Sequence, residues 1–212
     1  MTTINSVTLE VNDPAAANSF YEAAFALGPR LRVQASDAPT AGFRWFTLSL
    51  VVSQPGNVDA LVDAALAAGA TAVKPAAKSF WGYGGVVRAP DGTIWKIATS
   101  AKKDSGPATR DVDDLVLLLG VADVAATKRF YVDRGLTVAK SFGRKYVEFT
   151  AQADAIKLAL YGRKASAKDA GVPAEGTGSH RLRIDSDAGS FTDPDGFGWA
   201  PSVIQVDGRE TG

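Results

Sequence analysis

A set of four landmarks occurs twice in this chain. Each set has an aspartate, a Phe-Tyr pair, a Pro-Asp-Gly turn and a tryptophan three residues after the turn. The first set is Asp13, Phe20-Tyr21, Pro90-Asp91-Gly92 and Trp95, and the second is Asp123, Phe130-Tyr131, Pro194-Asp195-Gly196 and Trp199. The offset is 110 residues at the first two landmarks and 104 at the turns. Because this repeat is far longer than a solenoid unit, it predicts an internal duplication that produces two tandem modules.

Composition excludes several classes of protein. The 23 Lys and Arg residues balance 23 Asp and Glu residues, so net charge does not favour nucleic acid or an anionic membrane as a partner. Cysteine is absent from the 212 residues, which excludes disulfides, thiolate metal ligands and a Cys nucleophile. The first residues do not form a basic and apolar leader, and no apolar run reaches the roughly 18 residues of a membrane span. We therefore predict a cytoplasmic protein.

The first module is predicted to span residues 1–100. Alternating apolar residues predict a strand over 4–11. Asp13 and Pro14 are typical of a helix start, and Gly28 is typical of a helix stop. Further strands are expected around 31–33, 43–52, 71–73, 85–88 and 93–98, with a second helix over 59–68.

The second module is predicted to span residues 112–204, after a polar linker over 101–111 and before a tail over 205–212. Its first helix is expected to begin at Asp123 and to reach Val132, and a polar loop is expected over 162–179. Only about eight residues separate Ile184 from the Asp193 turn, so the counterpart of the second helix is predicted to be missing. The shortened module would leave a sheet edge exposed, and this favours a homodimer.

The order of these landmarks resembles the vicinal oxygen chelate superfamily, which includes glyoxalase I, bleomycin-resistance proteins and extradiol dioxygenases. The similarity covers roughly residues 4–201. It is most specific over 58–61, 67–70 and 73–75, and from Phe80-Trp81-Gly82 to Pro90-Asp91-Gly92 and Trp95. The resemblance implies an α+β fold in which two tandem βαβββ modules, the second shortened, form a curved mixed sheet. It also implies a cup whose concave face holds a ligand.

Catalytic members of this superfamily hold a divalent metal through His, Gln or Glu at three kinds of position. Carried over to this chain, the positions are Ser6 and Val116 on the first strands, His180 and a residue within about two of Leu50 on the middle strands, and Lys96 and Ala200 directly after the tryptophans. Only His180 has a suitable side chain, whereas catalytic sites use about three protein ligands. We therefore predict no catalytic metal and no other cofactor, and the pattern does not favour an enzyme.

A ligand site is instead expected from the residues that could line the cup. The stretch from Ser79 to Gly85 is the richest aromatic cluster, and aromatic walls suit flat ligands. The candidate ligand-binding residues are Phe46, Leu50, Trp81, Tyr83, Lys96 and His180. Structural roles stand beside these: Lys96 pairing with Glu10 or Glu148, His180 satisfied by backbone or solvent, and Trp81 filling a core.

The leading functional hypothesis is a metal-independent protein of the glyoxalase and bleomycin-resistance type, which binds a partly aromatic small molecule in the cup. One alternative is a divergent metal-dependent lyase, isomerase or dioxygenase that uses His180 with atypical donors such as Glu148. Another is a degenerate scaffold that binds nothing. Serine hydrolase and dinucleotide-binding motifs are absent from the sequence.

Overall fold

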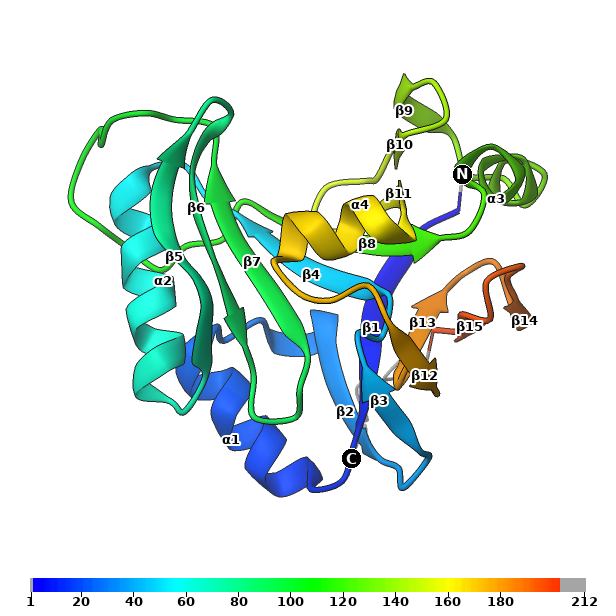
Figure 1. Ribbon diagram of the computed structural model, residues 1–212, viewed down its shortest axis with the longest axis horizontal. Helices are drawn as coiled ribbons and strands as arrows, with labels where there is room; N and C mark the ends of the chain where they lie inside the picture. The colour runs from blue at the N-terminus through cyan, green and yellow to red at the C-terminus, as the bar shows by residue number, and fades with distance from the viewer. Residues whose placement is uncertain (1, 203–212) are drawn as a thin grey trace, which may run out of the picture.

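The computed structural model describes residues 2–202 and shows a mixed α+β fold (Figure 1). Its described strands form an open eight-stranded sheet, an open five-stranded sheet and a two-stranded ribbon. The predicted fold class is confirmed. Residues 203 and 204 of the predicted second module, and the predicted tail at 205–212, lie outside the described residues. Within the described part, no helix is both long and apolar enough to cross a membrane.

The eight-stranded sheet consists of two halves with the same strand order. The first half has the order β4-β7-β6-β5 and the second has the order β8-β11-β10-β9, and β4 pairs antiparallel with β8 where the halves meet. The first half contains β4 (Phe46–Val51), α2 (Pro55–Ala67), β5 (Thr71–Ser79), β6 (Gly82–Arg88) and β7 (Ile94–Thr99). The second contains β8 (Asp114–Val121), α3 (Val124–Val132), β9 (Val138–Phe142), β10 (Tyr146–Phe149) and β11 (Lys157–Gly162). Each half is thus a complete βαβββ unit.

The five-stranded sheet, of order β14-β15-β13-β1-β2, combines the two ends of the described chain. It contains β1 (Ile4–Val11) and β2 (Leu31–Ala35), joined through α1 (Pro14–Ala24) and the short 3-10 helix η1 (Gly28–Arg30), and β13 (Leu182–Ser186), β14 (Phe191–Thr192) and β15 (Gly198–Pro201). β13 and β14 are joined without a helix, as predicted for the shortened second module. The ribbon pairs β3 (Thr40–Gly42) with β12 (Gly176–Gly178). Both large sheets therefore contain strands from both parts of the chain.

Local chemistry explains where the helices begin. The Asp13 carboxylate accepts a hydrogen bond from the Ala16 backbone N–H, and Asp123 accepts from Ala125 and Ala126. These bonds satisfy N–H groups that have no partner inside a helix, so the two predicted N-caps are confirmed. Burial by the sheets supplies the rest of the stability, and the core includes the fully buried Trp95.

The loop predicted over 162–179 is wrong in two places, because the structure has the helix α4 (Arg163–Ala170) and the strand β12 (Gly176–Gly178) there. This helix ends at Gly171, whose φ of +76° lies in the left-handed region that suits a helix stop. The buried face of α4 consists of small side chains, namely Ser166, Ala167 and Ala170. Because small residues give little hydrophobic periodicity, the pattern of the sequence did not reveal the helix.

Candidate functional site

Strand register places three of the positions expected from the resemblance side by side in the eight-stranded sheet. Ser49 on β4 is the cross-strand partner of both Val116 on β8 and Lys96 on β7. Side chains alternate along a strand, so Leu50 points to the opposite face, where it is fully buried in the core. The middle-strand position of this row is therefore Ser49.

The five-stranded sheet has a corresponding row in which an aspartate takes the middle position. Asp185 on β13 is the cross-strand partner of Ser6 on β1 and of Ala200 on β15. His180 precedes β13 by two residues and lies outside the row, so the position assigned to it from the sequence belongs to Asp185. The error arose because the start of β13 depends on the fold and cannot be counted from the flanking motif.

Neither row suits a divalent metal ion. The first row offers a hydroxyl, a methyl-bearing side chain and an ammonium, and the second offers only one carboxylate. That carboxylate is engaged, because Asp185 accepts hydrogen bonds from Arg183 at 2.8 Å, Thr8 at 2.6 Å and Ser6 at 3.2 Å. Among residues 2–202, no three His, Cys, Asp or Glu residues lie close enough to hold a metal. The donor set does not fit the metal centre that the resemblance implies.

Helix α4 lies against the face of the eight-stranded sheet that carries Lys96. The Lys96 ammonium lies 2.8 Å from the Asp169 carboxylate of α4. Lys74 on β5 donates to the carbonyls of Lys168 and Asp169 at the end of the helix, at 2.9 and 2.6 Å. A small apolar cluster adds to this packing and includes Phe43, Val86, Ile94, Ala167 and Ala170. Helix α4 therefore covers part of the sheet face around Lys96, whose side chain stays 35% exposed.

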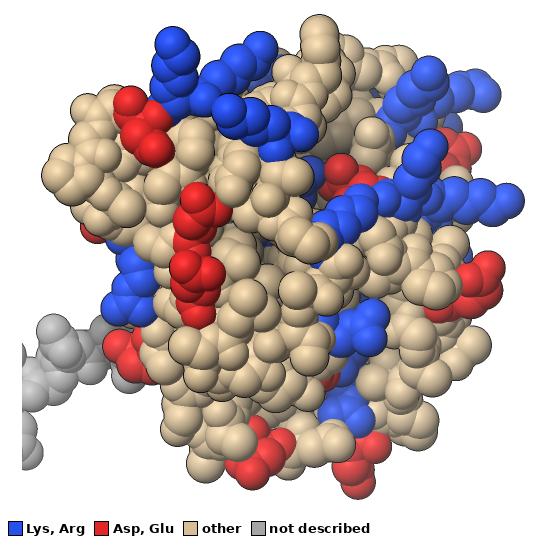
Figure 2. Space-filling view, turned by 60° about the vertical axis from the view of Figure 1, so that its left-hand side comes forward, with Lys and Arg blue, Asp and Glu red and all other residues tan. Residues whose placement is uncertain are grey.

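The surface charge is unevenly distributed although the net charge is zero. On the face drawn in Figure 2, several Lys and Arg side chains gather around a hollow in the upper part of the view, where acidic side chains also lie, and further acidic side chains are spread over the rest of the face. The balanced composition therefore does not exclude local attraction of anionic small molecules.

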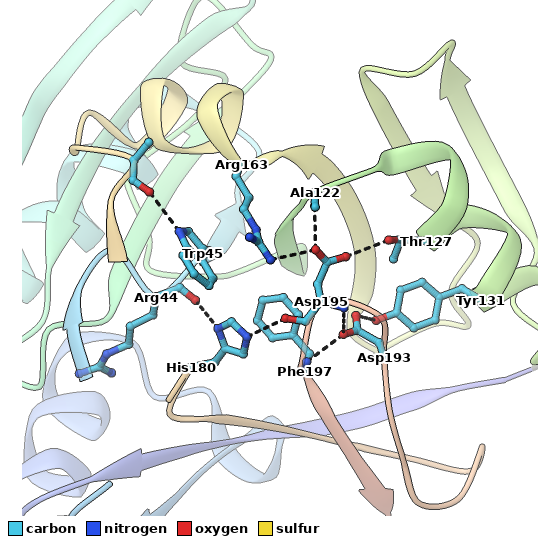
Figure 3. Close-up of polar contacts among 11 residues, drawn as sticks. Arg44, Trp45, Ala122, Thr127, Tyr131, Arg163, His180, Asp193, Asp195 and Phe197 are labelled. Carbon is cyan, nitrogen blue, oxygen red and sulfur yellow. Dashed lines mark hydrogen bonds and ion pairs between the residues drawn. The ribbon is translucent and has the colours of Figure 1, made fainter. Parts of the chain in front are cut away.

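His180 joins the segment before β4 to the second Pro-Asp-Gly turn (Figure 3). Its Nδ1 lies 2.9 Å from the Arg44 carbonyl oxygen and its Nε2 lies 3.1 Å from the Asp195 carbonyl oxygen. Both partners are carbonyl oxygens and therefore acceptors, so a ring nitrogen that carries a proton can donate to the carbonyl that it faces. The ring also stacks on Phe197 at a centroid distance of 3.9 Å. Both ring nitrogens are thus engaged in a structural contact.

The signature tyrosines hold the Pro-Asp-Gly turns in place. Tyr21 Oη donates to the Asp91 carboxylate at 2.8 Å, and Tyr131 Oη donates to the Asp193 carboxylate at 2.6 Å. The Asp195 carboxylate in turn accepts from the Ala122 N–H, Thr127 and Arg163 (Figure 3). These contacts give the recurring Tyr and Asp residues a structural role.

Asp193 supports a prediction about pH. Burial raises the pKa of its carboxyl above the usual value, although hydrogen bonds from Tyr131 and two backbone N–H groups oppose the shift. A raised folded-state pKa favours folding only while the group is protonated, and this contribution is lost as pH rises through that pKa. The wild type should therefore lose stability relative to Asp193→Asn as pH rises. We expect the difference between their unfolding free energies, wild type minus variant, to fall between about pH 4 and neutrality. Denaturant titrations across this range would measure it, and a constant difference would contradict the assignment.

The six residues predicted to bind a ligand do not meet in one place. Phe46 and Leu50 are buried in the core, and Trp81 lies at the β5–β6 turn with 82% of its surface exposed. Tyr83 donates to Asp59 at 2.8 Å, and Lys96 and His180 make the contacts described above. Of the six, Phe46 alone lines either of the two cavities described next.

The largest described cavity, of about 700 Å³, lies beside α1. Its walls come from α1, from the β6–β7 turn at Pro90-Asp91 and from two arginines, Arg44 and Arg181. A second cavity of about 390 Å³ shares Thr40 and Arg44 with the first. Neither arginine was predicted from the sequence, in which the two lie 137 residues apart. Their positions in the sequence offered one indication, because each arginine comes just before a strand. Arg44 precedes β4, which begins at Phe46, and Arg181 precedes β13, which begins at Leu182.

Comparisons with known proteins agree with the architecture. No protein-family model matches the sequence, and no curated protein matches it. Glyoxalase I from Zea mays has a similar structure, with a TM-score of 0.61 and 14% identity over 94% of this chain and 91% of that one. A protein of Bacillus subtilis subsp. subtilis str. 168 has a TM-score of 0.54 and 12% identity over 86% and 69%. The chain described here therefore has the vicinal oxygen chelate fold.

Proposed function

We propose that the protein binds a small molecule, without a metal ion, in the cavity beside α1. The observation that carries the proposal is the cavity itself, because its volume of about 700 Å³ lies within the range of ligand sites. Its lining combines apolar side chains, among them Phe20 and Tyr21, with a few polar groups. Ligand sites of globular proteins typically have this mixture.

The two rows of cross-strand partners support the metal-free part of the proposal. Catalysis by the metal-dependent members of this fold needs His, Gln or Glu side chains, and the row around Ser49 places Lys96 where a carboxylate is expected. The alternative donors, His180 and Glu148, are already engaged, because Glu148 accepts from Tyr146 at 3.0 Å and lies 3.5 Å from the Lys140 ammonium. A binding protein agrees better with these contacts than a metalloenzyme does.

A probe with an apolar ring system tests the site. The neutral dye phenylnaphthylamine should bind to the wild type with fluorescence enhancement, and Ala16→Trp should reduce its affinity about tenfold or more by filling the cavity. Ala16 is exposed and lines the cavity, so the larger side chain is not forced into the core. Ala15→Trp is the matched control, because Ala15 is also exposed on α1 but does not line the cavity. If Ala16→Trp and Ala15→Trp bound the dye with equal affinity, or if the wild type did not bind it, the proposed site would be refuted.

Elemental analysis tests the metal-free part. Protein incubated with excess Zn²⁺, Ni²⁺, Fe²⁺ or Mn²⁺ and then desalted should retain far less than one ion per chain. One ion per chain that is lost in His180→Ala would instead support the metal-dependent enzyme.

A further inference from the structure

Two arginines on the wall of the large cavity form no ion pair with a carboxylate among the described residues. None of the ion pairs formed within residues 2–202 includes Arg44 or Arg181. Arg181 is only 7% exposed, and it donates to the carbonyls of Ala38 and Ser36 and to the Asn12 side chain. These acceptors are neutral, so the charge of a buried guanidinium is left without a counterion.

Arg44 is also incompletely satisfied. Its Nη2 donates to the Asp91 carbonyl, whereas its Nη1 is buried and has no hydrogen-bond partner among the described residues. Thr40 Oγ1 is likewise buried and unpartnered. Thr40 and Arg44 are the residues shared by the two cavities, so two unsatisfied polar atoms belong to residues at the junction of the cavities. Buried polar groups are usually paired, and a site with two exceptions suggests that a partner is missing.

The acidic residues of the same cavity are committed to local donors. The Asp91 carboxylate accepts from Tyr21, from the Thr93 hydroxyl and from the Thr93 N–H, and Asp13 accepts from the Ala16 N–H as a helix cap. Burial lowers the pKa of the Arg44 guanidinium, an effect that the charge of Asp91 opposes and that of Arg181 reinforces. The charge of Asp91 outweighs the repulsion from Arg181 but does not offset the burial of the Arg44 guanidinium, so a bound anion would compensate part of the remaining cost of burial.

Backbone geometry holds Arg181 in its place. Its φ of +54° lies in the left-handed region. A residue other than glycine adopts this conformation at a cost of the order of 1 kcal/mol or more. Such conformations occur where the surrounding contacts require them, often at ligand sites. Here the conformation accompanies a guanidinium fixed by three hydrogen bonds beside the cavity.

We infer that the cavity recognises a small molecule bearing an oxyanion, a carboxylate, phosphate or sulfonate, and that Arg44 with Arg181 forms its binding subsite. This inference rests on the proposed function, because it names the class of ligand for the same cavity. Guanidinium groups match oxyanions well, since their planar N–H donors can bind two oxygens at once. The apolar wall from α1 would hold the body of the ligand.

The test uses two dyes that share a ring system. Anilinonaphthalene sulfonate is phenylnaphthylamine with an added sulfonate, so the pair isolates the contribution of the anion. Arg44→Gln should weaken binding of the sulfonate dye about tenfold or more, the scale of a lost charge-assisted hydrogen bond, and should leave the neutral dye within about twofold. Arg88→Gln is the matched control, because Arg88 is exposed and lines only the smaller cavity. Circular dichroism would verify that each variant is folded.

A second measurement leaves both arginines unchanged. Inorganic phosphate and benzoate should each displace the sulfonate dye from the wild type at ionic strength matched with chloride, and neither should displace it from Ala16→Trp beyond the residual binding. If both dyes bind equally and Arg44→Gln affects them equally, the oxyanion subsite is refuted while the proposed cavity stands. If neither dye binds to the wild type in a manner sensitive to Ala16→Trp, the proposed function itself fails.

Discussion

Trp95→Ala is expected to lower the unfolding free energy by about 3–5 kcal/mol, which corresponds to a melting temperature roughly 10 °C lower for a chain of this size. Trp95 is fully buried, and its ring lies 4.7 Å from the Phe25 ring and 5.6 Å from the Tyr21 ring between centroids. Truncation removes these contacts and leaves a cavity that rigid neighbours cannot fill. Thermal unfolding followed by circular dichroism measures the effect.

The matched control for this prediction is Trp81→Ala. Trp81 is 82% exposed and contacts Phe80 edge-on at the β5–β6 turn. Its truncation should change the unfolding free energy by no more than about 0.5 kcal/mol. If both variants melted at the temperature of the wild type, the described core around Trp95 would be wrong.

Asp185→Ala is expected to cost about 3–5 kcal/mol for a different reason. The Asp185 carboxylate is buried between Arg183 and the hydroxyls of Ser6 and Thr8, which are themselves buried. Removal of the acceptor would leave the two buried hydroxyl groups without their partner and would break the ion pair with Arg183, whose side chain is 32% exposed. Denaturant unfolding of this variant, of Arg183→Ala and of the double variant gives the coupling energy.

The double variant distinguishes coupling from general damage. We expect its destabilisation to be clearly smaller than the sum of the single effects, because a missing partner costs less when its counterpart is also absent. Asp187→Ala provides a control, since Asp187 is exposed and its carboxylate accepts a hydrogen bond from the Thr3 backbone N–H. Strictly additive losses would mean that the two side chains do not interact.

Features determined by neighbouring residues could be predicted from the sequence. The strand at Ile4–Val11 and the helix starts at Asp13 and Asp123 agree with the structure. In each case the signal lies within a few residues, as side-chain alternation or as a cap that satisfies the first N–H groups of a helix. Such signals do not depend on how distant segments pack.

Features determined by distant segments could not be predicted. Ser49 and Asp185 acquire their positions only from the register of β4 and β13 against strands far away in sequence. The two arginines of the cavity are brought together by tertiary packing, and single positions of this kind carry no periodic signal. Helix α4 was not predicted for a related reason, because its alanines form a buried face only when the helix packs against the sheet.

Each large sheet combines strands that are distant in sequence, and this has a consequence for folding. β1 must find β13, and β4 must find β8, before either large sheet is complete. Contacts between residues so far apart in sequence carry a large entropic cost of loop closure. Folding should therefore be slow, and the pairing of β1 with β13 should be among its last steps. A nascent chain that has been made only as far as β7 would present the edges of β1 and β4 without their partners, and such edges promote association with other chains. The strands β13, β14 and β15, which are synthesised long after β1, therefore complete the sheet to which β1 belongs.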